Sequence, residues 1–484
     1  MQSTSTFPKP WGPDGSLWLL LIAAASVSLI MLSGNELWTM ESRWAAVTLQ
    51  MILRNDYLHP FIYNGPYYDK PLLSYWLILA CAKAIGNLNE WALRLPSALA
   101  SIIAVYCTYS IGQTLINRST GLMAGWLLIT LFFFDTWGRI ASADMLNVAG
   151  ITLAILWYIK HKDDPHFFNY LIFFIITAIT CLCKGLAGIV LPLLAVAPDL
   201  FSQQGWKKHR HFSLLIAGLC GVIIYLLPFF MSAYFGDQTL KSSGLIEVFQ
   251  ENVKRFISPF DHAASFYAYF TYLPVYLLPW LVFFIPALFY NLWKWKELHA
   301  NQRYLTQVAI LFLLFFSLSG SKRGYYILPM LPFAVLVTAD WLNNFLFFYH
   351  NNWSIRLQYV VYVIFIAILL WFGTVQPFYN QRDSGIWQFA EQVQKAQKIA
   401  NSNQAWNDWE ITVLNSAADS SAIFYLQPQH PVNAVDLHAI DRAKIIIAAK
   451  KDLHKIQPIL SNYYVIVENK NSPEAAVALI PKKQ

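Results

Sequence analysis

Long apolar runs recur along this chain, and they limit its fold more than any other feature. About eleven runs approach the length of about 20 residues that an α-helix needs to cross a bilayer. Charged residues make up only 13% of the 484 residues, about half the share of 25% that is typical of soluble globular chains. We therefore predict an α-helical polytopic membrane protein with about eleven transmembrane helices.

The first predicted helix, residues 17–33, follows a polar N-terminal lead and has no clear small-residue cleavage site, so we expect it to be retained. Residues 34–94 are too polar to lie within lipid but are rich in aromatic residues, which favours helices at the membrane interface. The other predicted spans are 95–115, 121–137, 143–160, 167–183, 185–198, 212–232, 265–291, 305–318, 325–342 and 356–376.

Basic loops suggest the orientation of these spans. With the N-terminus in the cytoplasm, IKHKDD, GWKKHRH and LWKWKELHANQR become cytoplasmic loops, as the bias of such loops towards Lys and Arg predicts. Residues 34–94 and the loop SGSKRG at 319–324 then lie outside. The outer loops hold about as many Lys and Arg residues as the inner ones. Because the bias predicts fewer Lys and Arg residues outside, these outer positive charges call for a functional explanation.

The composition changes near Asn380, where transmembrane-length runs end and charged residues become more frequent. The β-like runs ITVL, AIFYL, KIIIAA and YYVIVEN alternate with the helix-like stretches IWQFAEQVQKAQKIA and DLHKIQPIL. This alternation predicts a small soluble α/β domain. We therefore divide the chain into a transmembrane catalytic domain at 1–379, with its first outer loop at about 34–94, and an outer α/β domain at 380–484.

Two other classes of function are disfavoured. The net charge of +7 is spread among apolar spans rather than gathered on one soluble face, so we predict no binding to nucleic acid. The five cysteines lie in or beside apolar runs without metal-binding spacing, so we interpret them as small apolar side chains without disulfides.

Carboxylates, cations and a histidine gather in the outer loops. These candidates are Glu36, Glu41, Arg43, Asp69, Lys70, Asp135, Arg139, Asp144, Lys184, Arg255, His262, Lys322, Arg323, Tyr325 and Tyr326. This mixture suits a reaction in which a carboxylate takes a proton from an attacking hydroxyl while cations stabilise a phosphate leaving group. A lipid-linked sugar flippase or another transporter is the alternative. However, ion-coupled transporters usually carry acidic residues near the centres of their spans. Residues 309–318, inside one predicted span, contain no ionisable residue, which disfavours a transporter.

Several motifs together resemble one family. They are MESRWA at 40–45, NDYLHP, NGPYYDKPLLSYW, RIASADM, CKGLAGIVLP, ENVKRF with a following His, and SGSKRGYYILPMLP. In order and spacing, over residues 30–335, they resemble the bacterial GT-C glycosyltransferases related to the lipid A aminoarabinose transferase and to protein O-mannosyltransferases. The resemblance implies the GT-C fold and an enzyme of the bacterial inner membrane with a periplasmic active site. Such an enzyme moves a monosaccharide, with inversion, from a polyprenyl phosphate to lipid A, another envelope glycan or a protein.

The resemblance also implies roles for single residues. Arg43 and Lys70 match phosphate-binding cations, and Asp69 matches an acidic residue that orients the lysine or holds a metal. Asp144 matches the aspartate of the second outer loop. The other positions expected to line the donor site are Arg139, Lys184, Arg255, His262, Lys322, Tyr325 and Tyr326. A divalent metal held by Asp69 and His262 is a possible cofactor, since oxygen and imidazole ligands suit several ions.

One position departs from the family pattern. Relatives carry an Asp-Glu pair in the first outer loop, whereas this chain has Met40-Glu41, so the usual catalytic aspartate is absent. We favour Glu41 as the base, because its longer side chain could reach a similar point. Glu36 and Asp144 are alternatives, and so is an inactive relative with a binding role.

Overall fold

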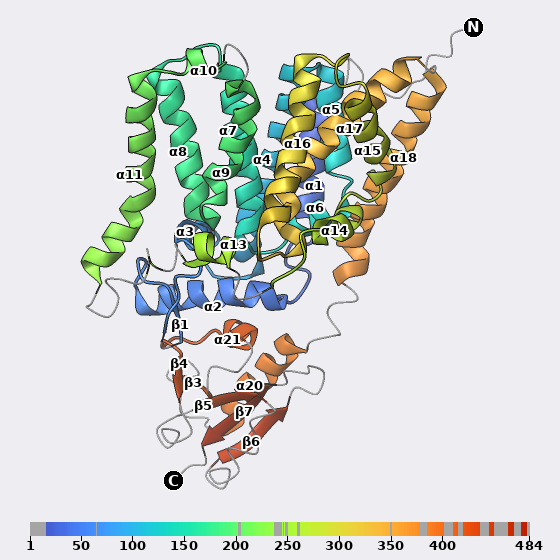
Figure 1. Ribbon diagram of the computed structural model, residues 1–484. Coiled ribbons are helices and arrows are strands. Elements are labelled where there is room, and N and C mark those ends of the chain that lie inside the picture. Colours follow the sequence, from blue (N-terminus) through green and yellow to red (C-terminus); the bar gives the residue numbers. More distant parts are fainter. Residues whose placement is uncertain are drawn as a thin grey trace.

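The computed structural model describes residues 16–481 apart from 64, 202–204, 237–243, 245, 247–249, 259–261, 349–350, 378–384, 401–409, 415–419, 436–444, 450–462 and 469–475. Helices dominate up to Val375, and a β-sheet forms near the C-terminus (Figure 1). The protein is therefore a helical membrane protein, in agreement with the predicted class.

The helical part is built from one long bundle with short connecting helices. Its first elements are α1 (Leu17–Leu29), α2 (Thr39–Arg54), α3 (Leu73–Ile85), α4 (Glu90–Leu115), α5 (Arg118–Leu128), α6 (Phe132–Gly138), α7 (Ala143–His161), α8 (Phe167–Lys184) and α9 (Ala187–Leu200). They are followed by α10 (Gly205–Lys208), α11 (Phe212–Phe235), η1 (Gln250–Lys254), α13 (Arg255–Ile257), α14 (Ala268–Tyr276), α15 (Leu281–Trp293), α16 (Ala300–Leu318), η2 (Gly324–Met330), α17 (Leu331–Phe348), α18 (Asn351–Leu370) and η3 (Trp371–Val375).

Six of the described helical segments are long and apolar enough to cross a bilayer, and α5 with α6, bent by 73°, makes up to seven. The six are Glu90–Leu115, Ala143–His161, Phe167–Lys184, Phe212–Phe235, Gly324–Phe345 and Ile355–Val375. Four shorter apolar helices are α1, α3, α9 and α15. Every predicted span contains a helix, but the span predicted at 265–291 is divided between α14 and α15. The count of about eleven spans stays a prediction.

The two ends of the bundle differ. Helix α10, within one predicted cytoplasmic loop, lies at one end of the bundle, whereas α2, from the predicted first outer loop, lies across the opposite end (Figure 1). The start of α7 and the end of α8 also lie at the α2 end. The loops therefore separate as the orientation predicts, although the compartment that each end faces stays a prediction.

Helix α2 lies between the bundle and the C-terminal sheet (Figure 1). Every residue from Trp44 to Met51 is buried, so the helix is covered on all sides rather than lying with one open face on a membrane. Its apolar residues belong to a hydrophobic cluster that continues into the C-terminal region, where Phe389, Ile423 and Phe424 are buried. The first outer loop and the C-terminal region thus share one core.

The C-terminal sheet has five strands in the order β4-β3-β5-β7-β6. Its elements are α20 (Ile386–Ala400), β3 (Ile411–Leu414), α21 (Ser420–Leu426), β4 (Asn433–Val435), β5 (Ile445–Ala449), β6 (Tyr463–Glu468) and β7 (Ala476–Pro481). Strand β3 pairs in parallel with β4 and β5, and β7 is antiparallel to β5 and β6.

Most of the C-terminal elements were predicted from the sequence. The strands over ITVL, KIIIAA and YYVIVEN and the helix over 386–400 are present, whereas DLHKIQPIL lies outside the described residues. The strand predicted over AIFYL is wrong: this run lies in helix α21. A short apolar run does not distinguish a strand from a buried helical turn, and here consecutive buried residues pack against α2. The domain boundary at 379/380 stays a prediction.

Candidate active site

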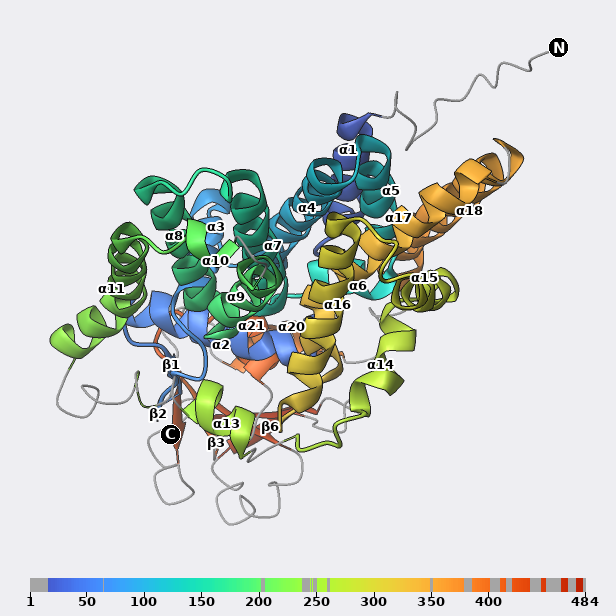
Figure 2. The same cartoon turned by 45° about the horizontal axis from the view of Figure 1, so that its top comes forward.

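A cavity of about 430 Å³ lies where α2, α7, α8, α9 and α16 come together. Helices α9 and α16 pack against each other in the bundle (Figure 2). The polar or aromatic residues that line the cavity include Arg43, Trp44, Tyr67, Asp69, Lys70, Tyr75, Ser142, Asp144, Asn147, Lys184, Arg323, Tyr325 and Tyr326. Its apolar residues include Met40, Leu186, Ala187, Val190, Val253, Phe256, Ile257, Phe315 and Phe316. The cavity is therefore amphipathic.

The first polar cluster is built around Asp69. The Tyr67 hydroxyl donates to Asp69 Oδ2 at 2.8 Å, and Lys70 Nζ donates to Asp69 Oδ1 at 3.0 Å. Arg43 Nη1 donates to the Tyr67 hydroxyl at 3.1 Å and lies 3.9 Å from Asp69 Oδ2. Burial and then the Asp69 carboxylate raise the pKa of Tyr67, so the hydroxyl stays neutral and keeps its proton for Asp69. Two cations around one carboxylate leave net positive charge at this wall.

Local backbone structure places this cluster. Arg43 is on α2 one turn after Met40, so both face the cavity. Strands β1 (Phe61–Ile62) and β2 (Gly65–Pro66) pair antiparallel, and the Tyr67 N–H donates to the carbonyl of Pro60 at 2.7 Å. Pro71 precedes α3, which begins at Leu73. Lys70 therefore lies just ahead of the N-terminus of a helix.

The second polar cluster joins Asp144 to Lys184. Asp144 is in the first turn of α7, where the Ser142 side chain accepts a hydrogen bond from the Asp144 N–H at 3.2 Å. Lys184, the last residue of α8, donates to Asp144 Oδ1. The Lys184 ammonium also lies 4.8 Å from the centre of the Tyr326 ring. Among the described residues, Asp144 and Asp69 are the carboxylates that line the cavity.

The segment after α16 closes a third side of the cavity. Arg323 donates to the Tyr325 hydroxyl at 3.0 Å, and its Nη2 lies 2.6 Å from Nε2 of His262. Lys322 does not line the cavity; its ammonium binds the backbone oxygens of Ala264 and Ser319. Arg255 begins α13, and its side chain lies outside the described part of the structure. His262 and Lys322 thus hold the loop that carries Arg323.

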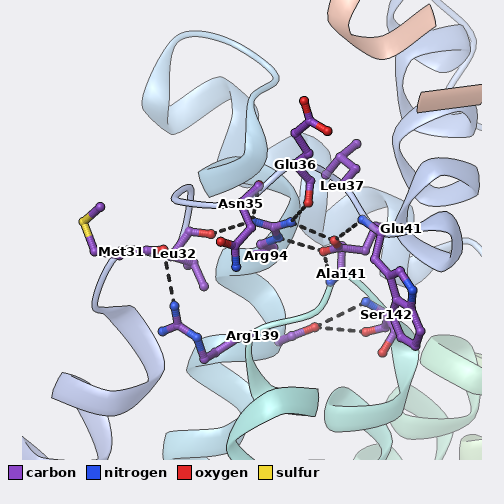
Figure 3. A network of polar contacts seen from close by, with 12 residues as sticks. Met31, Leu32, Asn35, Glu36, Leu37, Glu41, Arg94, Arg139, Ala141 and Ser142 are labelled. Carbon is purple, nitrogen blue, oxygen red and sulfur yellow. Dashed lines mark hydrogen bonds and ion pairs between the residues drawn. The ribbon is translucent and has the colours of Figure 1, made fainter. Parts of the chain in front are cut away.

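Glu41 is buried away from this cavity, with only 1% of its side chain exposed. Arg94 of α4 donates to Glu41 Oε1 at 2.8 Å and to Oε2 at 2.7 Å (Figure 3). The backbone N–H groups of Trp38 and Ala141 donate to the same two oxygens at 3.0 and 2.8 Å. Both oxygens of Glu41 are therefore engaged within the protein.

The Arg94 guanidinium joins this carboxylate to the loop before α2. It donates to the carbonyls of Leu32, Asn35 and Glu36 at 2.8, 3.1 and 3.0 Å (Figure 3). We call Glu41, Arg94 and these backbone partners the Glu41–Arg94 network. It connects the first outer loop, α4 and the loop between α6 and α7.

Two further candidates lie outside the cavity lining. Arg139 binds the carbonyls of Val27 at 2.7 Å and Ser28 at 3.3 Å, and it stacks over the Phe372 ring at 4.6 Å. Its guanidinium satisfies carbonyls at the C-terminal end of α1 that have no partner within the helix. Glu36 accepts a hydrogen bond from the Trp387 N–H at 3.0 Å.

The surroundings of Asp69 do not fit a metal ion. Its oxygens already accept from Lys70 and Tyr67, and Arg43 adds further positive charge. Among the described residues, no three His, Cys, Asp or Glu side chains are grouped so that they could hold a metal. A metal at Asp69 and His262 would have to displace these cations, so we derive no step through one.

Sequence reasoning did not single out Arg94, Tyr67 or Asn147. Arg94 could have been found as an ionisable residue at the start of an apolar helix, a position that usually has a specific partner. Asn147 follows Asp144 by one helical turn and is 99% buried at the cavity wall, and its Oδ1 has no hydrogen-bond partner in the described structure. No pattern in the sequence distinguishes it from other residues of α7.

Comparisons with known proteins agree with the motifs. The family model described as dolichyl-phosphate-mannose-protein mannosyltransferase matches residues 69–231. An undecaprenyl phosphate-α-4-amino-4-deoxy-L-arabinose arabinosyl transferase 1 of Pseudomonas fluorescens is 23% identical over 96% of this chain and 82% of its own length. A corresponding transferase of Pseudomonas aeruginosa is 26% identical over 66% of this chain and 58% of its own length.

Solved structures share the fold. ArnT from Cupriavidus metallidurans bound to undecaprenyl phosphate has a TM-score of 0.78 at 15% identity, covering 96% of this chain and 97% of ArnT. The oligosaccharyltransferase of Archaeoglobus fulgidus tethered with an acceptor peptide has a TM-score of 0.56 at 11% identity, over 96% and 74% of the two chains. These findings confirm the resemblance seen in the motifs.

Proposed function

We propose that this chain, a GT-C glycosyltransferase relative akin to the lipid A aminoarabinose transferases, is an inner-membrane enzyme. It transfers a monosaccharide from a polyprenyl phosphate to an acceptor at the α2 end of the bundle, which faces the periplasm. The observation that carries this proposal is the amphipathic cavity, where cations and carboxylates on one wall meet apolar residues of α9, α13 and α16 on another. A lipid phosphate bearing a sugar likewise has a polar, charged head and an apolar chain.

The cations would receive the phosphate. Lys70 and Arg43 converge beside Asp69, and Arg323 lines the same cavity. A phosphate leaving group develops negative charge as its bond to the sugar breaks, and cations held in place stabilise that charge. Arg can bind two phosphate oxygens, whereas Lys acts as a point charge. The apolar wall would hold the first isoprene units of the carrier.

Asp144 is the carboxylate best placed to act as the base. It lines the cavity, whereas both oxygens of Glu41 are occupied by Arg94 and backbone N–H groups. In the proposed step, the acceptor oxygen or nitrogen bonds to the anomeric carbon, and Asp144 takes its proton. The bond between that carbon and the phosphate oxygen breaks, which releases the polyprenyl phosphate and inverts the anomeric centre.

The sugar would lie between these two clusters. Asn147 and Ser142 line the cavity near Asp144, and the aromatic rings of Tyr325 and Tyr326 lie beside Lys184. Amide and hydroxyl groups can bind sugar hydroxyl or amino groups, and aromatic rings can pack against the faces of a sugar. We propose lipid A as the first acceptor to test, with another envelope glycan or a protein as the others.

Replacing Lys70 by alanine tests the phosphate role. With purified protein and undecaprenyl-phosphate-linked 4-amino-4-deoxy-L-arabinose, Lys70→Ala should lower the rate of undecaprenyl phosphate release by about 10²–10³-fold, the usual cost of one transition-state contact. Lys83→Ala removes an exposed lysine of α3 and should leave the rate unchanged. Normal turnover by a folded Lys70→Ala protein would exclude Lys70 as the phosphate anchor. Movement of the lipid in liposomes without phosphate release would instead favour the flippase alternative.

Met40 motivates a second candidate, a relative that binds the lipid phosphate without transferring the sugar. Met40 lines the cavity where the family pattern has an aspartate. We expect the natural chain to release undecaprenyl phosphate and Met40→Asp to change this rate less than Asp144→Asn does. Met40→Asn is the matched control, because it has nearly the size of aspartate without its charge. Release that begins only in Met40→Asp would instead establish the binding role.

A further inference from the structure

The C-terminal region packs on α2 rather than standing apart from the membrane part. Trp44 and Val47 of α2 belong to the same buried cluster as Phe389 of α20 and Ile423 and Phe424 of α21. Helix α2 also carries Met40, Arg43 and Trp44 in the cavity wall. One helix therefore has the candidate site on one side and the C-terminal core on another.

Hydrogen bonds fix this contact along the whole length of α2. Each of them joins a residue of the C-terminal region to the stretch between Glu36 and Leu88. They are Trp387 N to Glu36 Oε1 at 3.0 Å, Leu37 N to Tyr425 Oη at 2.9 Å, Gln50 Nε2 to Val432 O at 2.6 Å, Arg54 Nη2 to Asn433 Oδ1 at 3.3 Å and Gln427 Nε2 to Leu88 O at 3.4 Å. Such a set specifies one docked position, since directional bonds fail when the two surfaces slide.

Tyr425 lies at the critical end of this contact. Its hydroxyl accepts from the N–H of Leu37, which directly precedes Trp38, the N-cap residue of α2. Burial and then the carboxylate of Glu90 raise the pKa of Tyr425, so its hydroxyl remains neutral. Arg94 binds the carbonyls of the preceding residues, including Glu36, from the bundle side. The entry to α2 is thus fixed from both sides.

We propose that Tyr425 is a positioning residue: through Leu37, the C-terminal region fixes the first turn of α2 and thereby the cavity wall formed by Met40, Arg43 and Trp44. This role goes beyond the chemistry proposed above. Only its ligand-binding consequence rests on the proposed function, because that consequence concerns the phosphate expected near Arg43.

Tyr425→Phe in the full-length protein tests the proposal, because it removes the hydroxyl and keeps the ring. In hydrogen–deuterium exchange, peptides covering residues 37–44 should exchange about 3- to 10-fold faster, as the loss of one hydrogen bond allows. Peptides covering 445–449 should not change. Affinity for undecaprenyl phosphate should fall by a similar factor. Gln50→Leu, which removes a second buried bond across the same contact, should also raise exchange within α2.

Thr412→Val is the matched control. It removes a side-chain hydrogen bond, from Oγ1 to the carbonyl of Ile445 at 3.1 Å, that stays within the C-terminal sheet. Unchanged exchange at 37–44 in Tyr425→Phe would overturn the proposal, whatever the result for Gln50→Leu. An equal increase in Thr412→Val would do the same, since it would indicate general loosening. If the natural chain does not bind undecaprenyl phosphate, the proposed function fails while the exchange result still decides the role of Tyr425.

Discussion

Asp144→Asn should abolish most sugar transfer while leaving the protein folded, with kcat lower by about 10²–10⁴-fold, as the loss of a general base implies. The amide oxygen of asparagine can still accept the hydrogen bond from Lys184, so the two helices that meet there should remain joined. The amide cannot take a proton from the acceptor. Steady-state release of undecaprenyl phosphate, measured beside the thermal unfolding temperature, separates these two effects.

Asp163→Asn provides the control for Asp144. Asp163 lies beyond the other end of α7, is exposed, and pairs with Lys208, so its replacement should leave transfer unchanged. Undecaprenyl phosphate should still bind Asp144→Asn, because Lys70 and Arg43 are untouched. Full transfer by Asp144→Asn would exclude it as the base and would leave Asp69 as the other carboxylate of the cavity.

Arg94→Ala and Glu41→Ala should each destabilise the protein strongly, by about 3–5 kcal/mol, because removing one partner leaves an uncompensated buried charge. Each change also breaks backbone contacts: Arg94 binds three carbonyls, and Glu41 binds the N–H groups of Trp38 and Ala141. Thermal unfolding in detergent, followed by tryptophan fluorescence, measures the loss. Lys208→Ala, which breaks an exposed ion pair, should not change the unfolding temperature measurably.

A further variant, Glu41→Gln, distinguishes a structural Glu41 from a catalytic one. If Glu41 served as the base, Glu41→Gln would keep the unfolding temperature and lose transfer. We expect Glu41→Gln to lower the unfolding temperature, because the neutral amide leaves Arg94 without its charge partner. The folded fraction should still transfer the sugar, because Asp144 stays in place. An unfolding temperature equal to that of the natural chain, together with lost transfer, would assign the base to Glu41.

The sequence allowed much of the site to be anticipated. Asp69 and Lys70 are adjacent in the sequence, and Arg43 belongs to the same first outer loop, so placing that loop outside already puts the three residues on one side of the membrane. Asp144 and Lys184 come together because the end of α8 meets the start of α7, which is a consequence of antiparallel neighbouring helices. Assigning each loop to one side of the membrane, from the predicted spans, was enough to predict that these residues lie at the same end of the bundle.

Other features depend on contacts that no local pattern contains. Glu41 and Arg94 are 53 residues apart, and only the folded chain shows that they neutralise each other. Polarity and aromatic content predicted interfacial helices within residues 34–94, but they could not reveal that the C-terminal region covers α2. Tyr425 was assigned to a strand because its apolar run is short, and its helical turn follows from packing against α2. These features depend on packing between residues far apart in the sequence, which patterns within a short segment do not contain.

The contact between Leu37 and Tyr425 joins residues 388 positions apart, which has a consequence for biosynthesis. The ribosome must add all of these residues after Leu37 before the entry to α2 acquires its second support. Until then, apolar residues of α2 that end in the shared core, such as Val47, have no C-terminal partner. A chain that stops before Tyr425 would leave this surface of α2 uncovered. Its cavity wall at Met40 and Arg43 would then depend on contacts with the bundle alone.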